Sequence, residues 1–239
     1  MTGGKLGIGL VLGYGCLSLL ACHGRPPSAE ALKGIPAAYA DRPQLQGRAV
    51  VELEIQTAEG RGRVLLEIRG DAAPLTAGHF VDLVQRGFYN GLTFHRVEKD
   101  PQPFVVQGGD PRGDGSGGAT EPGSSRLRTL PLEIQVRGEP YPRYNTLIED
   151  PLALSKLALP HRLGAVAMVR SSPLDSASSQ FYIALSDLPI LDGRYAVFGY
   201  VTSGMEWVER IQVGDVIRSA RVLEGAELLR VPSPKPVAN

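Results

Sequence analysis

The sequence contains very little cysteine and no excess of charge of either sign. Its 239 residues include two cysteines, Cys16 and Cys22, and its 25 lysines and arginines balance its 25 aspartates and glutamates. Because both cysteines lie near the N-terminus, the rest of the chain cannot form a disulfide of its own. A neutral chain gives no electrostatic footprint for nucleic acid, so we expect no nucleic-acid partner.

Motifs for metal-dependent and nucleophilic chemistry are also missing. The histidines, at 23, 79, 95 and 161, do not have the spacing of a metal site, so we expect no metal and no cofactor. The chain has no G-x-S-x-G turn of the serine hydrolases. The glycine-rich stretch GGDPRGDGSGG lacks the lysine and the serine or threonine that end a phosphate-binding loop.

Glycine and proline, in contrast, are abundant, with 29 and 19 residues, which favours a mainly β fold with many turns. Helical spacing predicts helices over 74–87 and 204–211 and a short one around 151–157. Because helices are so few, we expect a closed antiparallel barrel with helices over its ends, since closure removes exposed strand edges. Strands are predicted over 50–56, 64–68, 93–97, 104–107, 164–168, 180–184, 196–201 and 216–223, with a further strand or edge segment over 130–136.

The N-terminus has the layout of a secretory signal. Lys5 precedes an apolar run that ends in the sequence LLAC at residues 19–22. These four residues resemble a bacterial lipobox, in which cleavage precedes a cysteine that becomes lipidated. We therefore predict a lipoprotein-type signal over 1–21 and a lipid anchor on Cys22. An ordinary signal peptide with an incidental cysteine, or a single anchoring helix, remains an alternative.

The rest of the chain is predicted to form one domain. A hydrophobic content of 43 % suffices for one sizeable core but not clearly for two. We expect residues 48–230 to fold as this domain and to be monomeric. The proline- and alanine-rich residues 22–47 are predicted to form a partly extended linker, and residues 231–239 a tail.

Short blocks with the order and spacing of a known family occur along this domain. They are GFYNG at 87–91, FHR at 94–96, FVVQGGD at 104–110, GSGG at 115–118, SQFYI at 179–183, LDG at 191–193 and VFG at 197–199. Together they resemble the cyclophilins, the family of peptidyl-prolyl cis–trans isomerases, and look nearest to the thylakoid-lumen branch of cyanobacteria and chloroplasts. The resemblance implies a closed eight-stranded antiparallel barrel capped by two helices. It also implies an exported protein of the periplasm or thylakoid lumen.

The resemblance further implies which residues act. The expected reaction is rotation of X–Pro peptide bonds in exported proteins, whose barrier of about 18–20 kcal/mol comes from amide resonance. A hydrogen-bond donor aimed at the amide nitrogen, beside an apolar pocket for the proline ring, favours the twisted amide over the planar one. The resemblance assigns the donor to Arg96, held by Gln107, and pairing with the substrate backbone to Arg170. It assigns the proline pocket to Phe104, Val105, Phe181, Leu191 and Tyr195.

Some positions depart from the family pattern. Val105 stands where methionine is usual, Tyr182 where phenylalanine is usual, and Tyr195 where histidine is frequent. An insertion over 119–163 is longer than in minimal members and is expected to remodel the surface beside the groove. An alternative hypothesis is therefore a cyclophilin-shaped scaffold that binds proline-containing segments with little turnover.

Overall fold

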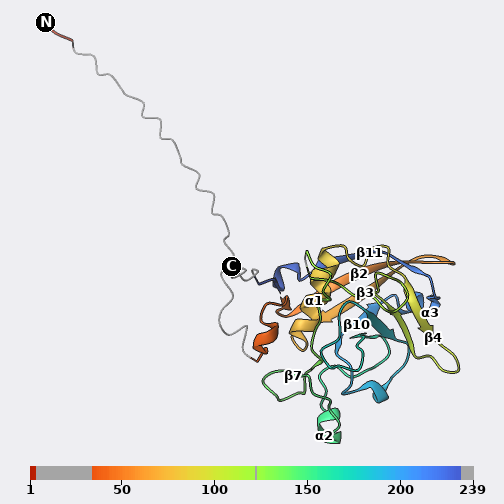
Figure 1. Cartoon of the computed structure of the whole chain (residues 1–239). Coiled ribbons are helices and arrows are strands. Elements are labelled where there is room, and N and C mark those ends of the chain that lie inside the picture. The colour runs from red at the N-terminus through yellow and green to blue at the C-terminus, as the bar shows by residue number, and fades with distance from the viewer. Residues whose placement is uncertain (4–33, 122, 233–239) are drawn as a thin grey trace.

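The structure is a computed structural model that describes residues 1–3, 34–121 and 123–232 (Figure 1). Its centre is an eight-stranded antiparallel sheet with the strand order β11-β2-β3-β10-β8-β9-β5-β4. These strands are β2 (Arg48–Thr57), β3 (Gly60–Arg69), β4 (Phe94–Glu98), β5 (Val105–Gly108), β8 (Ala165–Met168), β9 (Phe181–Ala184), β10 (Val197–Ser203) and β11 (Val216–Glu224). Every strand predicted for this sheet is present, and the mainly β fold is confirmed.

The described residues also form several helices and four short strands outside the main sheet. The α-helices are α1 (Pro74–Gln85), α2 (Pro151–Leu154) and α3 (Met205–Arg210), and the 3-10 helices are η2 (Ala37–Tyr39), η3 (Pro189–Leu191) and η4 (Ala226–Leu228). Two small sheets pair β1 (Gln44–Leu45) with β12 (Leu229–Arg230), and β6 (Glu133–Ile134) with β7 (Arg143–Tyr144). The segment predicted as a strand over 130–136 is thus only the two residues of β6.

The main sheet is open, whereas the sequence predicted a closed barrel. Its end strands, β4 and β11, do not form a ladder with each other. A single bridge joins Thr93 to Val216, and the amides of Gly91 and Phe94 donate to backbone carbonyls at Ile217 and Asp215. The two edges therefore meet through the loop before β4, which satisfies part of their backbone without continuing the strand pairing. The count of two capping helices stays a prediction.

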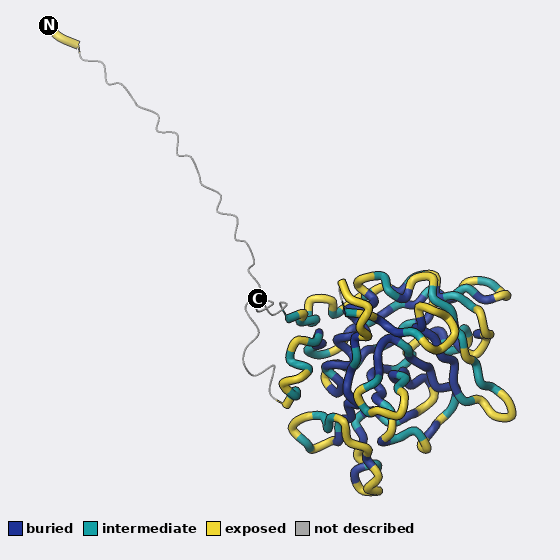
Figure 2. The backbone as a smooth tube through the Cα atoms, in the orientation of Figure 1, coloured by how far each residue is buried: buried dark blue, intermediate teal, exposed yellow. Residues whose placement is uncertain are grey.

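Alternation along the strands separates an inner from an outer face of the sheet. Alternate residues of β2 are buried, as expected for a strand with one face on a core: Ala49, Val51, Leu53 and Ile55. On α1, the ring of Phe80 lies 5.0–5.5 Å from the rings of Tyr89, Phe181 and Phe198. These aromatic contacts mark the centre of the core, which appears dark blue in Figure 2.

Residues 34–47 pack on the domain, although the sequence predicted that they belong to a linker over 22–47. Leu45 of β1 is fully buried, and its strand pairs with β12 near the other end of the domain. A Cβ on Gly78 of α1 would lie 2.5 Å from the Pro43 carbonyl oxygen, so glycine is needed for this close approach. The predicted signal after Gly3, Cys22, the linker up to residue 33 and most of the tail lie outside the described residues.

A buried carboxylate from the insertion caps the N-terminus of α1. The N-cap residue of this helix, Ala73, has no side-chain acceptor. Glu133 instead accepts from the backbone amides of Leu75 and Thr76 at 3.1 and 2.8 Å, and from the Tyr144 hydroxyl at 3.0 Å. Burial raises the pKa of Glu133, while these donors oppose the shift. The insertion is therefore part of the fold and not an appended loop.

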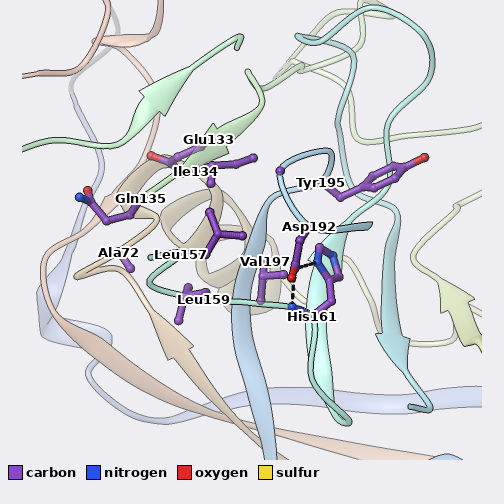
Figure 3. Close-up of a pocket in the computed structure, with 11 residues that line it drawn as sticks. Ala72, Glu133, Ile134, Gln135, Leu157, Leu159, His161, Asp192, Tyr195 and Val197 are labelled. Carbon is purple, nitrogen blue, oxygen red and sulfur yellow. Dashed lines mark hydrogen bonds and ion pairs between the residues drawn. The ribbon is translucent and has the colours of Figure 1, made fainter. Parts of the chain in front are cut away.

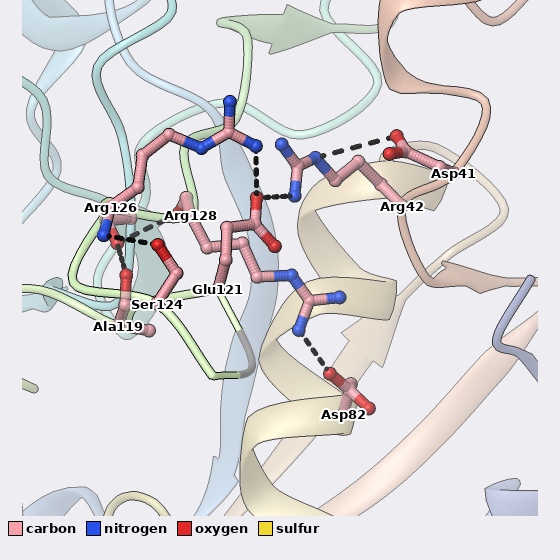
Figure 4. A network of polar contacts seen from close by, with 9 residues as sticks. Asp41, Arg42, Asp82, Ala119, Glu121, Ser124, Arg126 and Arg128 are labelled. Atoms are coloured by element: carbon pink, nitrogen blue, oxygen red, sulfur yellow. Dashed lines mark hydrogen bonds and ion pairs between the residues drawn. The ribbon is translucent and has the colours of Figure 1, made fainter. Parts of the chain in front are cut away.

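A second polar network joins the insertion to α1 and to residues 34–47 (Figure 4). Arg128, which is buried, donates to Asp82 of α1 over 2.7 Å. Glu121 accepts from Arg42 and lies 3.7 Å from a guanidinium nitrogen of Arg126. The pairs Arg128–Asp82 and Glu121–Arg42 therefore fix the insertion to two other parts of the chain.

His79 is predicted to make the fold sensitive to acid. The side chain is fully buried, and burial followed by the charges of Arg128 and Arg42 lowers its pKa from 6.5 to about 3. The unfolded chain therefore binds a proton below pH 6.5 that the folded chain does not. The contribution of His79 to stability is complete above pH 6.5 and falls by about 1.36 kcal/mol per pH unit below it.

Urea denaturation between pH 7 and pH 4.5 tests this prediction. The unfolding free energy of His79→Leu is expected to fall less steeply over this range than that of the unsubstituted chain. The reason is that the unfolded variant has no histidine at position 79 to bind a proton. Equal pH dependences of the two proteins would contradict the assignment.

Candidate active site

The polar residues predicted on β4 and β5 lie opposite one another across an antiparallel pair. Arg96 is in register with Gln107, and Glu98 with Val105. The Arg96 guanidinium donates from Nη1 to Oε1 of Gln107 over 2.9 Å. Gln107 is only 6 % exposed, whereas the Arg96 side chain is 46 % exposed. A buried amide therefore holds an accessible cation at the edge of the sheet.

A β-bulge turns Arg96 to the outer face. Phe94 pairs with Gly108 while Arg96 pairs with Gln107, so His95 is an extra residue in β4. In a regular strand, Phe94 and Arg96 would share a face, because side chains alternate with a period of two. Phe94 is fully buried in the core and Arg96 is exposed. The bulge thus lets one short strand supply both a core aromatic and an accessible guanidinium.

An amide chain continues from Gln107 to the glycine-rich loop. Gln107 Nε2 donates to Gln180 Oε1 over 2.9 Å and lies 3.2 Å from His95 Nε2. Gln180 Nε2 in turn donates to the carbonyl oxygens of Gly115 and Gly117 at 2.9 and 2.8 Å. The sequence analysis did not assign a role to Gln180 or to this loop, although both lie in the blocks that match the family pattern. These hydrogen bonds fix the orientation of the Gln107 amide, with its Oε1 towards Arg96.

An apolar surface lies on the outer face beside these polar groups. We call it the outer apolar cluster, and its members are Phe104, Val105, Tyr182, Leu191 and Tyr195. Val105 and Tyr182 are buried, and the other three are partly exposed and pack against the buried ones. Four of the five pocket residues predicted from the sequence are thus brought together.

Phe181, the fifth, lies elsewhere, so its predicted place in the pocket is wrong. Its side chain is fully buried on the inner face, with its ring 5.5 Å from that of Phe80 and 5.4 Å from that of Tyr89. The next residue, Tyr182, points to the outer face, where its ring is 5.9 Å from that of Tyr195. Because adjacent strand residues face opposite ways, choosing between Phe181 and Tyr182 required the phase of β9, which two aromatic neighbours do not reveal.

The Tyr182 hydroxyl has a buried partner from the insertion. It lies 2.8 Å from Nε2 of His161, whose Nδ1 lies 2.8 Å from Oδ1 of Asp192. The same Asp192 oxygen accepts from the His161 backbone amide over 2.8 Å. Nδ1–H then donates to Asp192, which leaves Nε2 to accept from Tyr182. Burial raises the pKa of Tyr182 well above its usual value, so the phenol stays protonated.

Tyr195 borders a small hollow on the insertion side, whose lining residues are drawn in Figure 3. A hollow of about 10 Å³ lies between the insertion and the sheet, with Glu133, His161, Asp192 and Tyr195 among its lining residues. Such a volume holds about one water molecule at most. A substrate cannot enter here, so the outer apolar cluster is accessible only from its solvent side.

Arg170 packs on the Tyr195 ring. Its guanidinium carbon lies 5.0 Å from the ring centroid, and its Nε donates to the carbonyl oxygen of Arg194 over 2.9 Å. Next to it is an open hollow of about 300 Å³, which is also lined by Gln107, Gln180 and Leu127. Arg170 and Gln107, the residue bonded to Arg96, thus border the same hollow.

The described residues contain no group of histidines, cysteines, aspartates and glutamates that could hold a metal ion. They also contain no helix with the length and apolarity needed to cross a bilayer. The site as described offers a cation, a fixed amide and an apolar surface. Such a set can stabilise a polar group held above that surface by hydrogen bonding and charge.

Comparison with known proteins finds relatives of one family. A family model described as "Cyclophilin type peptidyl-prolyl cis-trans isomerase/CLD" matches residues 51–232. A putative thylakoid lumen peptidyl-prolyl cis-trans isomerase of Synechocystis sp. is 42 % identical over 205 residues, which are 82 % of this chain and 52 % of that protein. The chloroplastic peptidyl-prolyl cis-trans isomerase CYP38 of Arabidopsis thaliana is 40 % identical over 217 residues, with 84 % and 48 % covered. The chain thus spans about half the length of these two relatives.

Shorter relatives and solved structures are also similar. Peptidyl-prolyl cis-trans isomerase B of Bacillus subtilis is 35 % identical over 164 residues, which are 69 % of this chain and 93 % of that protein. A crystal structure of a Cryptosporidium parvum cyclophilin type isomerase matches 74 % of this chain and 98 % of its own, with a TM-score of 0.55 and 25 % identity. A second structure of that protein, solved in the presence of the dipeptide Ala-Pro, has a TM-score of 0.53 and 25 % identity, and 72 % of this chain is covered.

Tyr182→Phe is predicted to destabilise the fold by about 1–3 kcal/mol, because it leaves Nε2 of His161 buried without its donor. The unfolding free energy in urea measures the effect. Tyr141→Phe is the matched control, since Tyr141 is 41 % exposed, and a change below about 0.5 kcal/mol is expected there. Equal stabilities of the two variants would contradict the bond between Tyr182 and His161.

Proposed function

Because this chain belongs to the cyclophilin family of peptidyl-prolyl cis–trans isomerases, we propose that it catalyses the rotation of X–Pro bonds in polypeptides. Arg96 is the proposed catalytic residue and Gln107 the residue that holds it. The outer apolar cluster is the proposed proline pocket, with Tyr182 in place of Phe181. The backbone at Arg170 is proposed to pair with the substrate chain.

The observation that carries this proposal is the fixed position of the Arg96 guanidinium beside the outer apolar cluster. Gln107 holds Arg96 through a hydrogen bond of 2.9 Å, and Val105 of the cluster is two residues before Gln107 on the same face of β5. A proline ring lying on Phe104 and Val105 would bring its amide nitrogen near this cation. Arg96, Gln107 and Val105 of the proposed site therefore belong to one pair of strands.

This arrangement favours the twisted amide by electrostatics. When the C–N bond rotates out of plane, resonance is lost and the lone pair returns to the nitrogen. A donor that is stronger towards that nitrogen than towards the planar amide lowers the barrier, and each 1.36 kcal/mol of such preference is worth about tenfold in rate. Arginine suits this role because its guanidinium stays protonated and its N–H groups have fixed directions.

The proposed setting is outside the cytoplasm. The N-terminal pattern of Lys5, an apolar run and LLAC supports export, and two of the most similar relatives carry thylakoid lumen or chloroplastic in their names. We propose that the folded domain, a monomer, assists the folding of exported proteins in a thylakoid lumen or a periplasm. A lipid on Cys22 would hold it at the membrane, with the residues from 23 to 33 as the tether.

Arg96→Ala is predicted to lower kcat/KM for a proline-containing peptide by about 10²–10³-fold, the usual effect of removing a donor to the transition state. Proline-limited refolding of a test protein should slow in parallel. Arg63→Ala is the matched control, since Arg63 is also an exposed strand arginine beside a glutamate. If both variants and the unsubstituted chain are equally slow but still bind the peptide, the chain is a proline-binding scaffold instead.

Cys22→Ser is predicted to abolish incorporation of a fatty-acid analogue when the full chain is expressed in bacteria. The thiol is the acceptor in lipobox processing, and serine does not replace it. Cys16→Ser is the matched control, because Cys16 lies within the predicted signal and should leave labelling unchanged. If the unsubstituted chain is exported but not labelled, its N-terminus is an ordinary signal peptide and Cys22 carries no lipid.

A further inference from the structure

A carboxylate contacts the proposed catalytic arginine directly. Glu98 Oε1 accepts from Nε of Arg96 over 2.9 Å and from Nη2 over 2.6 Å. The sequence analysis assigned no role in the site to Glu98. Its side chain is 43 % exposed, and Arg96 is the hydrogen-bond partner it has among the described residues. The contact lies at the solvent edge of the proposed site.

Strand geometry places Glu98 there. Arg96 and Glu98 are two residues apart on β4, beyond the bulge, so they share the outer face, while Val97 packs on the core. The backbone of Glu98 is fixed as well, because its carbonyl oxygen accepts from the amide of Phe104 over 3.0 Å. Lys99 then donates to the carbonyl oxygens of Glu209 and Ile211. The Glu98 carbonyl and the side chain of the next residue, Lys99, are thus both anchored by hydrogen bonds.

The contacts leave Arg96 able to act. A guanidinium has five N–H groups. Glu98 uses Nε–H and one N–H of Nη2, and Gln107 uses one N–H of Nη1. One N–H on each terminal nitrogen therefore remains for a substrate, and binding need not break the ion pair. The two partners hold the guanidinium from different sides and so fix the plane of those remaining donors.

We infer that Glu98 is a positioning residue for Arg96 in the proposed isomerase reaction. The ion pair is too exposed to add much to stability, since pairs of this kind are worth about 0–1 kcal/mol. Its effect is to restrict the rotamers of a long side chain, so that less ordering is needed when the amide twists. The inference rests on the proposed function, and it concerns how the arginine is aimed and not whether the chain folds.

Kinetics of the full chain with a proline-containing peptide test this inference. Glu98→Ala should lower kcat/KM by about 5- to 20-fold, mainly through kcat, because the aim of a transition-state donor is lost. Glu98→Gln should lose less, since its amide oxygen still accepts from Arg96. Glu139→Ala removes a similarly exposed partner from Arg143 in the insertion, and it should leave the rate unchanged. All three should melt within about 2 °C of the parent.

A double-substitution cycle separates positioning from a direct role. On the Arg96→Ala background, Glu98→Ala should cause no further loss, because there is no guanidinium left to aim. A full additional loss would overturn the inference, as would an unchanged or faster Glu98→Ala single variant. Faster turnover would mean that the carboxylate competes with the substrate for Arg96.

Proton exchange of the Arg96 Nε–H, measured by NMR, gives a readout that does not depend on turnover. The signal should be protected in the parent and in Glu139→Ala and exchange faster in Glu98→Ala. If the parent shows no turnover but this pattern holds, the proposed function fails while the positioning by Glu98 stands. If turnover is present and Arg96 exchange is the same with and without the carboxylate, the positioning fails alone.

Discussion

The hydrogen bond between Arg96 and Gln107 is the contact on which the proposed site depends. It joins two strands in register, and it links a side chain that solvent reaches to one that is buried. Gln107 can hold the arginine because Gln180 holds Gln107, and Gln180 is held by carbonyls of the glycine-rich loop. The aim of the guanidinium is therefore set by a chain of amides that extends well behind it. Glu98 adds a second contact from the solvent side.

The two faces of the sheet separate the side chains of the core from those of the proposed site. Phe181 and Tyr182 are adjacent in sequence, but one contributes to the core and the other to the outer apolar cluster. The same separation on β4 needs a bulge at His95, since Phe94 and Arg96 would otherwise face the same way.

The insertion over 119–163 supports both the fold and the surroundings of the site. Glu133 satisfies the first amides of α1, and Arg128 pairs with Asp82 of the same helix. His161 carries this support to the outer face through its contacts with Asp192 and Tyr182. The sequence indicated that the segment was long and would remodel the surface beside the groove, but not which residues it contacts. Its partners are distant in sequence, so no local pattern could reveal that it braces the helix and the apolar cluster.

The sequence by itself determined the family, the strands of the main sheet, the helix that begins at Pro74 and, through the family resemblance, the pair Arg96 and Gln107, because alternation, turn residues and ordered motifs are local properties of the chain. Tertiary structure alone decided that the sheet is open, that residues 34–47 pack on α1, that Tyr182 and not Phe181 reaches the outer face, and that Glu98 contacts Arg96. These features depend on register, on one bulge and on contacts between distant segments. The packing of the whole domain decides these features, because burial of the core selects one strand register only when all strands are in place.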